Sequence, residues 1–329
     1  MIPFFNYQAL FRDNEEKYIE IIKDVCSRGA FILQEDLENF EKNAAKFINV
    51  KHLIGVANGT DAIWLGLKAA GIKKDDEIIL PSHTYIASAA AIHFVGAKPV
   101  LAECGYDNML DVNDIEKRIT KNTKAIMAVQ VNGRCCDMDK IKELADKYNL
   151  LLLEDAAQAF GAKYKNSYAG TFGIFGTFSF YPAKLLGCFG DGGALVTNDD
   201  EIASKVKLLR DHGRDINGEV IEWGFNSRLD NLQAAILNEK LKTYSNDIKR
   251  RREIASRYHA GLKDLAELNL PQAPTTKSDN FDVFQNYELR AKNRDRLKKY
   301  LDEAGIKTII QWAGSPVHSF KNLGFSENI

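Results

Sequence analysis

Residues 175–199 read FGTFSFYPAKLLGCFGDGGALVTND, and this stretch decides the fold that the sequence predicts. Two apolar runs in it are strand-like, and a single lysine, Lys184, lies between them in a loop closed by Pro182 and a group of glycines. A lysine amine is costly to hold near a protein interior unless a partner or a chemical task offsets the cost. Lys184 is therefore the first candidate for a catalytic residue.

From about residue 50 onward, short apolar segments alternate with amphipathic ones. Strands are predicted at 52–58, 76–80, 98–103, 124–131, 150–155 and 192–198, and helices at 60–72, 85–96 and 138–149. Thr60 or Asp61 is expected to cap the first of these helices, and Gly71 to end it. Apolar strands that alternate with helices predict an α/β fold with a mostly parallel sheet covered by helices on both faces.

The pattern changes after this stretch. It predicts a helix at 201–212, a polar loop at 213–231, a long charged helix at 232–266 and a linker at 271–280. A strand at 283–291, a helix at 294–305 and a strand at 307–312 then predict a small α+β unit. We therefore expect a large domain with an N-terminal arm over residues 1–238 and a smaller C-terminal domain over 239–329.

Composition and charge exclude several classes of function. The 44 Lys and Arg residues nearly balance the 45 Asp and Glu residues, so no overall field favours nucleic acid or an acidic membrane. No secretory signal is recognisable, and no apolar run approaches the ~20 residues that a membrane helix needs. The five cysteines show no CxxC spacing and the six histidines no HxxxH pair, so neither a disulfide framework nor a metal site is expected. A reducing, cytoplasmic setting is predicted.

Three segments are expected to meet at the carboxyl edge of the sheet, where open α/β folds bind ligands. The amides of Gly59 and Thr60, at the start of a helix, could hold a phosphate, although an ordinary capped turn explains the same residues. Asp155 ends a strand too apolar to be exposed, so it needs a cationic or N–H partner, or else caps a helix. The third segment carries Lys184, with the hydroxyl of Ser179 five residues before it.

Taken together, these groups suit pyridoxal 5'-phosphate. This cofactor needs a lysine for its Schiff base, a carboxylate that keeps its ring nitrogen protonated, and a cup for its phosphate. The protonated ring stabilises a carbanion on the substrate, which is why the carboxylate matters. Tyr85 could supply an aromatic face against the ring.

At this point the sequence resembles the DegT/DnrJ/EryC1/StrS family of pyridoxal-phosphate-dependent sugar aminotransferases, which have the fold-type I architecture of aspartate aminotransferase. The resemblance covers nearly the whole chain and rests on motifs that occur in the family's order. They are RGAFILQEDLENFEKNAAKF, GVANGTDAIWLGLKAAGI, DEIILPSHTYIASAAAIHFVGAKPVLAE, LLLEDAAQAFGA, GTFSFYPAKLLGCFGDGGALVTND, LLRDHGR and GFNSRLDNLQAAIL.

The resemblance implies a role for each matching residue. Lys184 would form the Schiff base and move the proton, Asp155 would pair with the ring nitrogen, and Gln158 would hydrogen-bond the phenolic oxygen. The residues implied to hold the phosphate are Gly59, Thr60 and Ser179. Tyr85 falls on the position that stacks on the ring.

The resemblance also implies a homodimer with two shared active sites. Asn226, the asparagine of GFNSRL, would reach the phosphate bound by the neighbouring subunit. Tyr181 and His318 lie where the family contacts the sugar. Arg214 and Arg228 are candidates for gripping a donor carboxylate or a substrate phosphate, with surface salt bridges as the equally simple alternative.

Two segments depart from the family pattern. The usual His-Leu-Tyr-Gly is replaced by Gln130, Val131 and Asn132, and Gln311 stands where Ile-His-Tyr-Pro has its histidine. A glutamine can hydrogen-bond but cannot titrate near neutral pH, which disfavours an acid–base role at position 311. The family normally continues its small domain beyond the position of Ile329, so either a truncation or a true variation is expected there.

The resulting prediction is a transaminase that moves an amino group from glutamate or glutamine to a nucleotide-linked keto sugar, for a surface polysaccharide or related glycoconjugate. The sequence around Tyr85 is somewhat closer to enzymes that aminate C3 of a hexose than C4. Two alternatives stay open: a transaminase whose acceptor is a small keto phosphate or another non-nucleotide keto substrate, and a cofactor-binding regulator without turnover. Lys184 disfavours the family's dehydratase, which carries histidine there, and no GxGxxG supports a nicotinamide enzyme.

Overall fold

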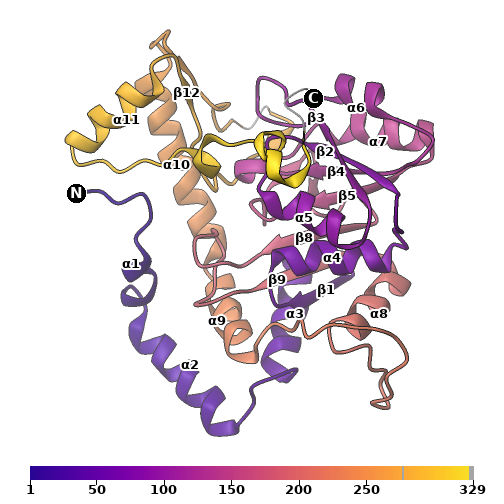
Figure 1. Cartoon of the computed structure of the whole chain (residues 1–329). Coiled ribbons are helices and arrows are strands. Elements are labelled where there is room, and N and C mark those ends of the chain that lie inside the picture. The colour runs from indigo at the N-terminus through magenta and orange to yellow at the C-terminus, as the bar shows by residue number, and fades with distance from the viewer. Residues whose placement is uncertain (276–277, 326–329) are drawn as a thin grey trace.

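A seven-stranded sheet organises the chain. The computed structural model describes residues 1–275 and 278–325, so positions 276–277 of the predicted linker lie outside the described residues. The strands follow in the order β1 (His52–Val56), β9 (Gly193–Thr197), β8 (Phe175–Ser179), β5 (Leu151–Asp155), β4 (Thr123–Val129), β2 (Glu77–Pro81) and β3 (Lys98–Ala102). All neighbours run parallel except β9, which is antiparallel to both β1 and β8. The predicted mostly parallel sheet is confirmed (Figure 1).

Each strand buries side chains on both faces, because helices cover the sheet on both sides. One face packs against α4 (Gly59–Ala69), α5 (Ile86–Phe94) and α8 (Asp200–Leu209). The other packs against α3 (Glu35–Phe47), α6 (Val112–Arg118), α7 (Met138–Tyr148) and α9 (Asn231–Leu241). In β2, Ile79 enters one core while Ile78 and Leu80 enter the other, as the period of two in a strand requires.

The remaining elements lie outside this sheet. At the N-terminus, α1 (Tyr7–Arg12) and α2 (Glu15–Arg28) extend away from it (Figure 1). The C-terminal part comprises α10 (Tyr244–Leu262), β10 (Leu268–Asn269), β11 (Asn280–Phe281), β12 (Arg290–Ala291) and α11 (Arg294–Glu303). The two short strands β6 (Lys163–Tyr164) and β7 (Ser167–Tyr168) form a small sheet with β11. Short 3-10 turns occupy Val131–Gly133, Gln311–Gly314, Val317–Ser319 and Lys321–Leu323.

Several predicted elements differ from the structure. The single helix predicted at 232–266 is wrong, because α9 and α10 are separated at Lys242 and Thr243. Tyr244 explains the break: its side chain enters the main core, and its hydroxyl donates to the carbonyl of Phe160 at 2.7 Å. A pattern of surface charge cannot reveal such a long-range contact.

The predicted strands at 283–291 and 307–312 are also wrong beyond the two residues of β12. The first segment instead packs against the large lobe, where Val283 is fully buried and its amide donates to the carbonyl of Gly133 at 2.9 Å. Trp312 and Ala313 adopt positive φ, which is incompatible with an extended strand. The domain boundary at residue 238 stays a prediction.

Candidate active site

Lys184 lies in the loop that joins β8 to β9, at the carboxyl edge of the sheet. Its amide donates to the carbonyl of Tyr181 at 2.8 Å, and its side chain is half-buried. Burial lowers the pKa of the Lys184 amine, while the charge of Asp155 acts in the opposite direction. A lysine whose pKa is lowered by burial holds more of the neutral amine that can attack a carbonyl or accept a proton.

Asp155 is buried at the end of β5, as its apolar strand predicted. Its Oδ2 accepts a hydrogen bond from the hydroxyl of Ser88 at 2.6 Å, and its Oδ1 accepts one from the amide of Ala157 at 3.1 Å. The Ser88 hydroxyl lies 2.8 Å from that of Thr84. Burial raises the pKa of Asp155, and Ser88, Ala157 and Lys184 oppose that rise. The structure thus brings the predicted carboxylate and lysine into electrostatic contact.

Helix α4 begins beside the same edge. Its N-cap is Asn58, whose side chain accepts from the amide of Asp61 at 2.8 Å, so the predicted cap at Thr60 or Asp61 is wrong. The first amides of a helix have no acceptor within it, so those of Gly59 and Thr60 are free to bind an anion. A Cβ on Gly59 would lie 3.0 Å from that of Ser179. Glycine therefore lets the helix start approach the hydroxyl that was predicted to share the phosphate.

The other cofactor residues occupy different surroundings. Gln158 is half-buried, and its Oε1 accepts from the amide of Asn132 at 2.7 Å. Tyr85 stands at the N-cap position of α5 with an exposed side chain. Asn226 is exposed on the loop before α9, next to Ser227, whose hydroxyl donates to Asp61 at 2.7 Å.

The predicted substrate residues are more scattered. Tyr181 is exposed, and its hydroxyl adds to burial in raising the pKa of Tyr7, whereas His318 Nδ1 lies 2.5 Å from the hydroxyl of Ser82. Arg214 is exposed, and Arg228 forms a 2.7 Å salt bridge with Asp211. Arg228 therefore has a salt-bridge partner within the chain, as the alternative to anion binding predicted. Gln311 Oε1 accepts from the side chain of Asn132 at 3.2 Å.

Gln130 does not face this site. It is fully buried and donates to Glu154 at 2.7 Å, while its oxygen accepts from the amide of Cys136 at the same distance. Of the residues that replace the family's His-Leu-Tyr-Gly, Gln130 is therefore part of the interior. Asn132, two residues later, does lie beside Gln158.

Gln285 is a residue that the sequence reasoning missed. Its Oε1 accepts from the amide of Leu185 at 2.7 Å, and its Nε2 donates to the carbonyl of Ala183 at 2.8 Å. One side-chain amide thus binds the peptides on both sides of Lys184. A strand-like pattern around Gln285 carried no signal of this contact, because the two segments lie about a hundred residues apart in the chain.

Replacing Gln285 with leucine is expected to lower turnover about tenfold, because misplacing a catalytic group by a fraction of an ångström is costly. The matched control is Gln233→Leu. Gln233 accepts from the amide of Phe189 at 2.8 Å. It therefore holds the same loop, but at a point five residues after Lys184. Steady-state rates and thermal midpoints of both variants separate positioning from stability. Equal losses of turnover in the two variants would contradict a specific role for Gln285.

Lys240 anchors the same loop and carries a pH prediction. Its amine donates to the carbonyl of Gly187 at 2.6 Å and lies 4.5 Å from the ring centre of Phe189. Burial lowers the pKa of Lys240 to about 8. At pH values between about 8 and the ordinary lysine pKa of about 10.4, the unfolded chain binds more protons than the folded one. The wild type should therefore gain stability relative to Lys240→Met as pH rises through this window, measured by denaturant unfolding. A constant difference would contradict the assignment.

The residues at this edge fit pyridoxal phosphate. A half-buried lysine amine, a buried carboxylate and the first two amides of a helix beside a serine hydroxyl are the donor set that the cofactor requires. Gly193 adds to the fit, since a Cβ there would lie 2.3 Å from the carbonyl carbon of Asn58 and displace the helix start. Fold and site together define a pyridoxal-phosphate-dependent aminotransferase.

The chain belongs to the DegT/DnrJ/EryC1/StrS aminotransferase family, whose sequence profile matches residues 12–324. It is 41% identical over 328 residues to the dTDP-3-amino-3,6-dideoxy-alpha-D-galactopyranose transaminase of Aneurinibacillus thermoaerophilus, covering 99% of this chain and 88% of the relative. It is 40% identical over 318 residues to the dTDP-3-amino-3,4,6-trideoxy-alpha-D-glucose transaminase of Streptomyces venezuelae, covering 96% and 83%.

Solved structures agree with this membership. Streptomyces venezuelae DesV, crystallised with a ketimine intermediate, superimposes with a TM-score of 0.94 at 39% identity, over 99% of this chain and 87% of that one. A Bacillus subtilis relative with bound cofactor PMP gives 0.89 at 31% identity, over 97% and 74%. The resemblance inferred from the motifs, the fold-type I architecture, the aminotransferase activity and the pyridoxal-phosphate cofactor are all confirmed.

Proposed function

We propose that this aminotransferase moves an amino group from glutamate or glutamine to a nucleotide-linked keto sugar, giving an amino sugar for a surface polysaccharide or related glycoconjugate. The observation that carries the proposal is the half-buried Lys184 amine, with its lowered pKa, beside the buried Asp155. The relatives named above support the acceptor class, since both are transaminases of dTDP-linked sugars. The donor is inferred from the resemblance alone.

Each residue of the site has a task in this reaction. When bound, pyridoxal phosphate supplies a carbonyl that joins amines and a ring that takes up the electrons left when a carbon loses its proton. Lys184 Nζ would hold the cofactor at rest, and would then accept the donor's α-proton and donate it to the cofactor's carbonyl carbon, on the other side of the transferred nitrogen. Asp155, buried and oriented by Ser88 and Ala157, would keep a proton on the ring nitrogen. Gly59, Thr60 and Ser179 would donate to the phosphate.

A two-stage assay tests the proposal. Purified enzyme is mixed with pyridoxal phosphate and glutamate, and release of the keto acid is measured without an acceptor. A panel of keto acceptors follows, with nucleotide-linked keto sugars on one side and small keto phosphates on the other. Amination of the sugars supports the proposal, and amination of the keto phosphates alone supports the alternative acceptor class. Failure of the first stage with both glutamate and glutamine would favour a regulator without turnover.

We also propose that two copies share their active sites. Asn226 is exposed, and the loop before it exposes five large apolar side chains. These are Ile216, Val220, Ile221, Trp223 and Phe225, of which Trp223 has 91% of its surface exposed. Such a patch is costly in water unless a second surface covers it, and a second copy would bring Asn226 to the neighbouring phosphate.

Mixing two inactive variants tests this arrangement. Lys184→Ala and Asn226→Ala chains, denatured and refolded together, would form mixed dimers in which one site has both wild-type residues. About a quarter of all sites should then be intact if chains pair at random in closed dimers. Activity well above the sum of the separate variants is expected. Its absence, in a mixture shown to contain mixed dimers, would contradict a shared site.

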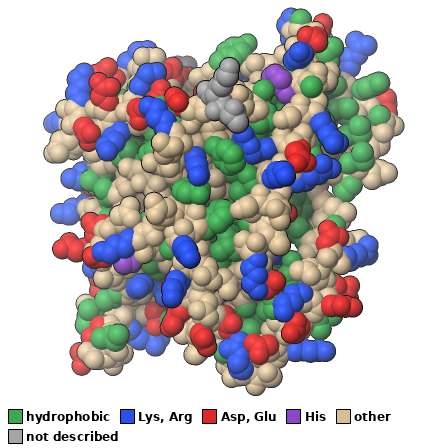
Figure 2. All heavy atoms as spheres, turned by 180° about the vertical axis from the view of Figure 1, so that it is seen from behind, with side chains coloured by type: hydrophobic (Ala, Val, Ile, Leu, Met, Phe, Trp, Pro, Cys, Tyr) green, Lys and Arg blue, Asp and Glu red, His purple; other side chains and the backbone are tan. Residues whose placement is uncertain are grey.

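We propose a cytoplasmic location for the enzyme. None of the helices in the described part of the chain is long and apolar enough to cross a membrane. All five cysteines are free, and on the face seen in Figure 2 acidic and basic side chains lie intermixed. Free cysteines fit a reducing compartment, which supports the predicted cytoplasmic location.

A further inference from the structure

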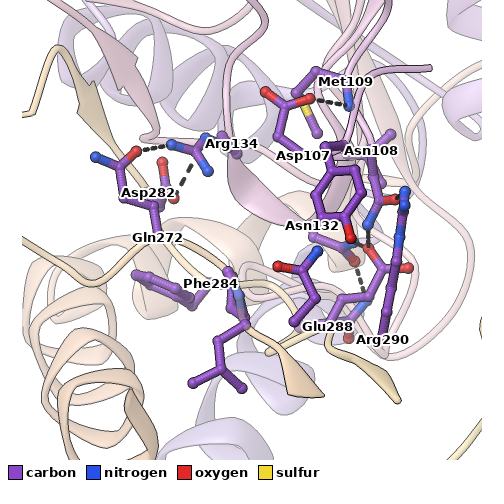
Figure 3. A pocket seen from close by; sticks show the side chains of 16 residues that line it. Asp107, Asn108, Met109, Asn132, Arg134, Gln272, Asp282, Phe284, Glu288 and Arg290 are labelled. Atoms are coloured by element: carbon purple, nitrogen blue, oxygen red, sulfur yellow. Dashed lines mark hydrogen bonds and ion pairs between the residues drawn. The ribbon is translucent and has the colours of Figure 1, made fainter. Parts of the chain in front are cut away.

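A cavity of about 380 Å³ lies next to the Lys184 site, and Asn132 and Glu288 are among the residues that line it. Figure 3 shows Glu288 together with Asn132, Asn108 and Arg290. Glu288 Oε2 accepts from the side-chain amide of Asn108 at 2.8 Å and from that of Asn132. Its Oε1 lies 3.5 Å from Nε2 of His83, and 20% of the side chain is exposed.

This cluster is joined to the Lys184 site by short contacts. The amide of Asn132 donates to Gln158 at 2.7 Å. His83 directly precedes Thr84, which lies 2.8 Å from Ser88, the partner of Asp155. Glu288 is also three residues after Gln285, which holds the peptides around Lys184. Glu288 therefore lies on the same side of the Lys184 site as Asn132 and Gln158, and a substrate bound at Lys184 would extend toward it on that side.

The hydrogen bonds within the cluster leave one acceptor open. Asn132 uses its amide hydrogens on Glu288 and Gln311, and its oxygen accepts from Asn286 at 2.8 Å. Within the described part of the chain, Glu288 Oε1 accepts no hydrogen bond, and its one recorded contact is the 3.5 Å approach of His83 Nε2, which itself has no hydrogen-bond partner. An ionised carboxylate can only accept, so the open position suits a hydroxyl donor and repels a phosphate or a second carboxylate.

We propose that Glu288 Oε1 accepts a hydrogen bond from the acceptor sugar's hydroxyl at C4, next to a keto carbon at C3. The inference rests on the proposed function. The two relatives named above differ at this position of the sugar. The 3,6-dideoxy product of one keeps a C4 hydroxyl, and the 3,4,6-trideoxy product of the other lacks it. Identities of 41% and 40% do not distinguish them, whereas a half-buried carboxylate oxygen left without a donor discriminates against the deoxy sugar.

The test uses the 3-keto sugars from which those two products would form. Wild-type kcat/KM should favour the hydroxylated acceptor by about 10²-fold or more. Glu288→Leu should bring the ratio close to one by losing the hydroxylated acceptor, and Glu288→Gln should keep part of the preference, because its amide oxygen still accepts. Asp107→Asn, which removes another carboxylate lining the same cavity, is the matched control and should leave the ratio unchanged.

The donor half-reaction separates the possible failures. Keto-acid release from glutamate should proceed at the wild-type rate in Glu288→Leu, since the donor does not need this carboxylate. An unchanged acceptor ratio in Glu288→Leu, or loss of the donor half-reaction with it, would overturn the inference. If the wild type used both acceptors equally well, the inference would also be overturned, but the proposed function would stand. Wild type that releases keto acid but aminates neither sugar would remove the proposed function and this inference together.

Discussion

Replacing Lys184 with alanine is expected to lower turnover by at least about 10⁴-fold, because one amine both holds the cofactor and carries the proton. Within the described residues, Lys184 is the one cation whose charge acts on the pKa of Asp155. The variant should still bind pyridoxal phosphate through the phosphate and ring contacts. Its absorption spectrum, however, should lack the visible band that the cofactor gains on joining a lysine amine.

Lys184→Arg is the sharper control for the same residue. Arginine keeps a positive charge beside Asp155 but stays protonated, so it can neither attack the carbonyl nor accept a proton. The arginine variant should therefore be as inactive as the alanine variant. Turnover retained by arginine would mean that the charge alone matters, and the assigned role of Lys184 would be wrong. Thermal midpoints close to that of the wild type would exclude unfolding as the cause.

Much of the fold and part of the site followed from local patterns. The apolar runs that became β1, β2, β4 and β5 are buried on both faces, so their composition alone marks them as strands of a mostly parallel sheet covered on both sides. Asp155 was recognisable because a carboxylate at the end of such a run cannot avoid burial. Lys184 was recognisable for a related reason, as an amine between two buried strands.

Contacts between distant segments escaped prediction. The run around Gln285 looked like a strand of a separate small unit, yet it returns to the large lobe, where Val283 fills the space that Gly133 leaves. A side chain on Gly133 would exclude that segment, since its Cβ would lie 2.7 Å from Val283. Neither glycine nor valine signals such a pairing locally, so the positions of Gln285 and Glu288 became visible only with the fold.

Glu154 directly precedes Asp155 in the chain but has a structural role. It is fully buried and accepts from the amides of Gly170 at 2.8 Å, Phe172 at 2.7 Å and Gly173 at 3.2 Å. The side chain of Gln130 donates a fourth bond at 2.7 Å. Burial raises the pKa of Glu154, and these four donors oppose the rise. One carboxylate therefore holds the loop after β7 against the end of β5.

Glu154→Ala is expected to cost roughly 4 kcal/mol of folding stability, because it leaves several buried N–H groups without an acceptor. For a domain of this size that loss corresponds to a fall in the thermal midpoint of roughly 10 °C, measured by calorimetry without added cofactor. Glu143→Ala, on the exposed face of α7, is the control and should change stability by no more than about 0.5 kcal/mol. Glu154→Gln should fall between the two, since its oxygen can satisfy some donors while its amide group opposes the others. If Glu154→Ala melted with the wild type, the four hydrogen bonds would add nothing net over solvation of the same groups in the unfolded chain. The loop would then have to be held by its apolar contacts alone.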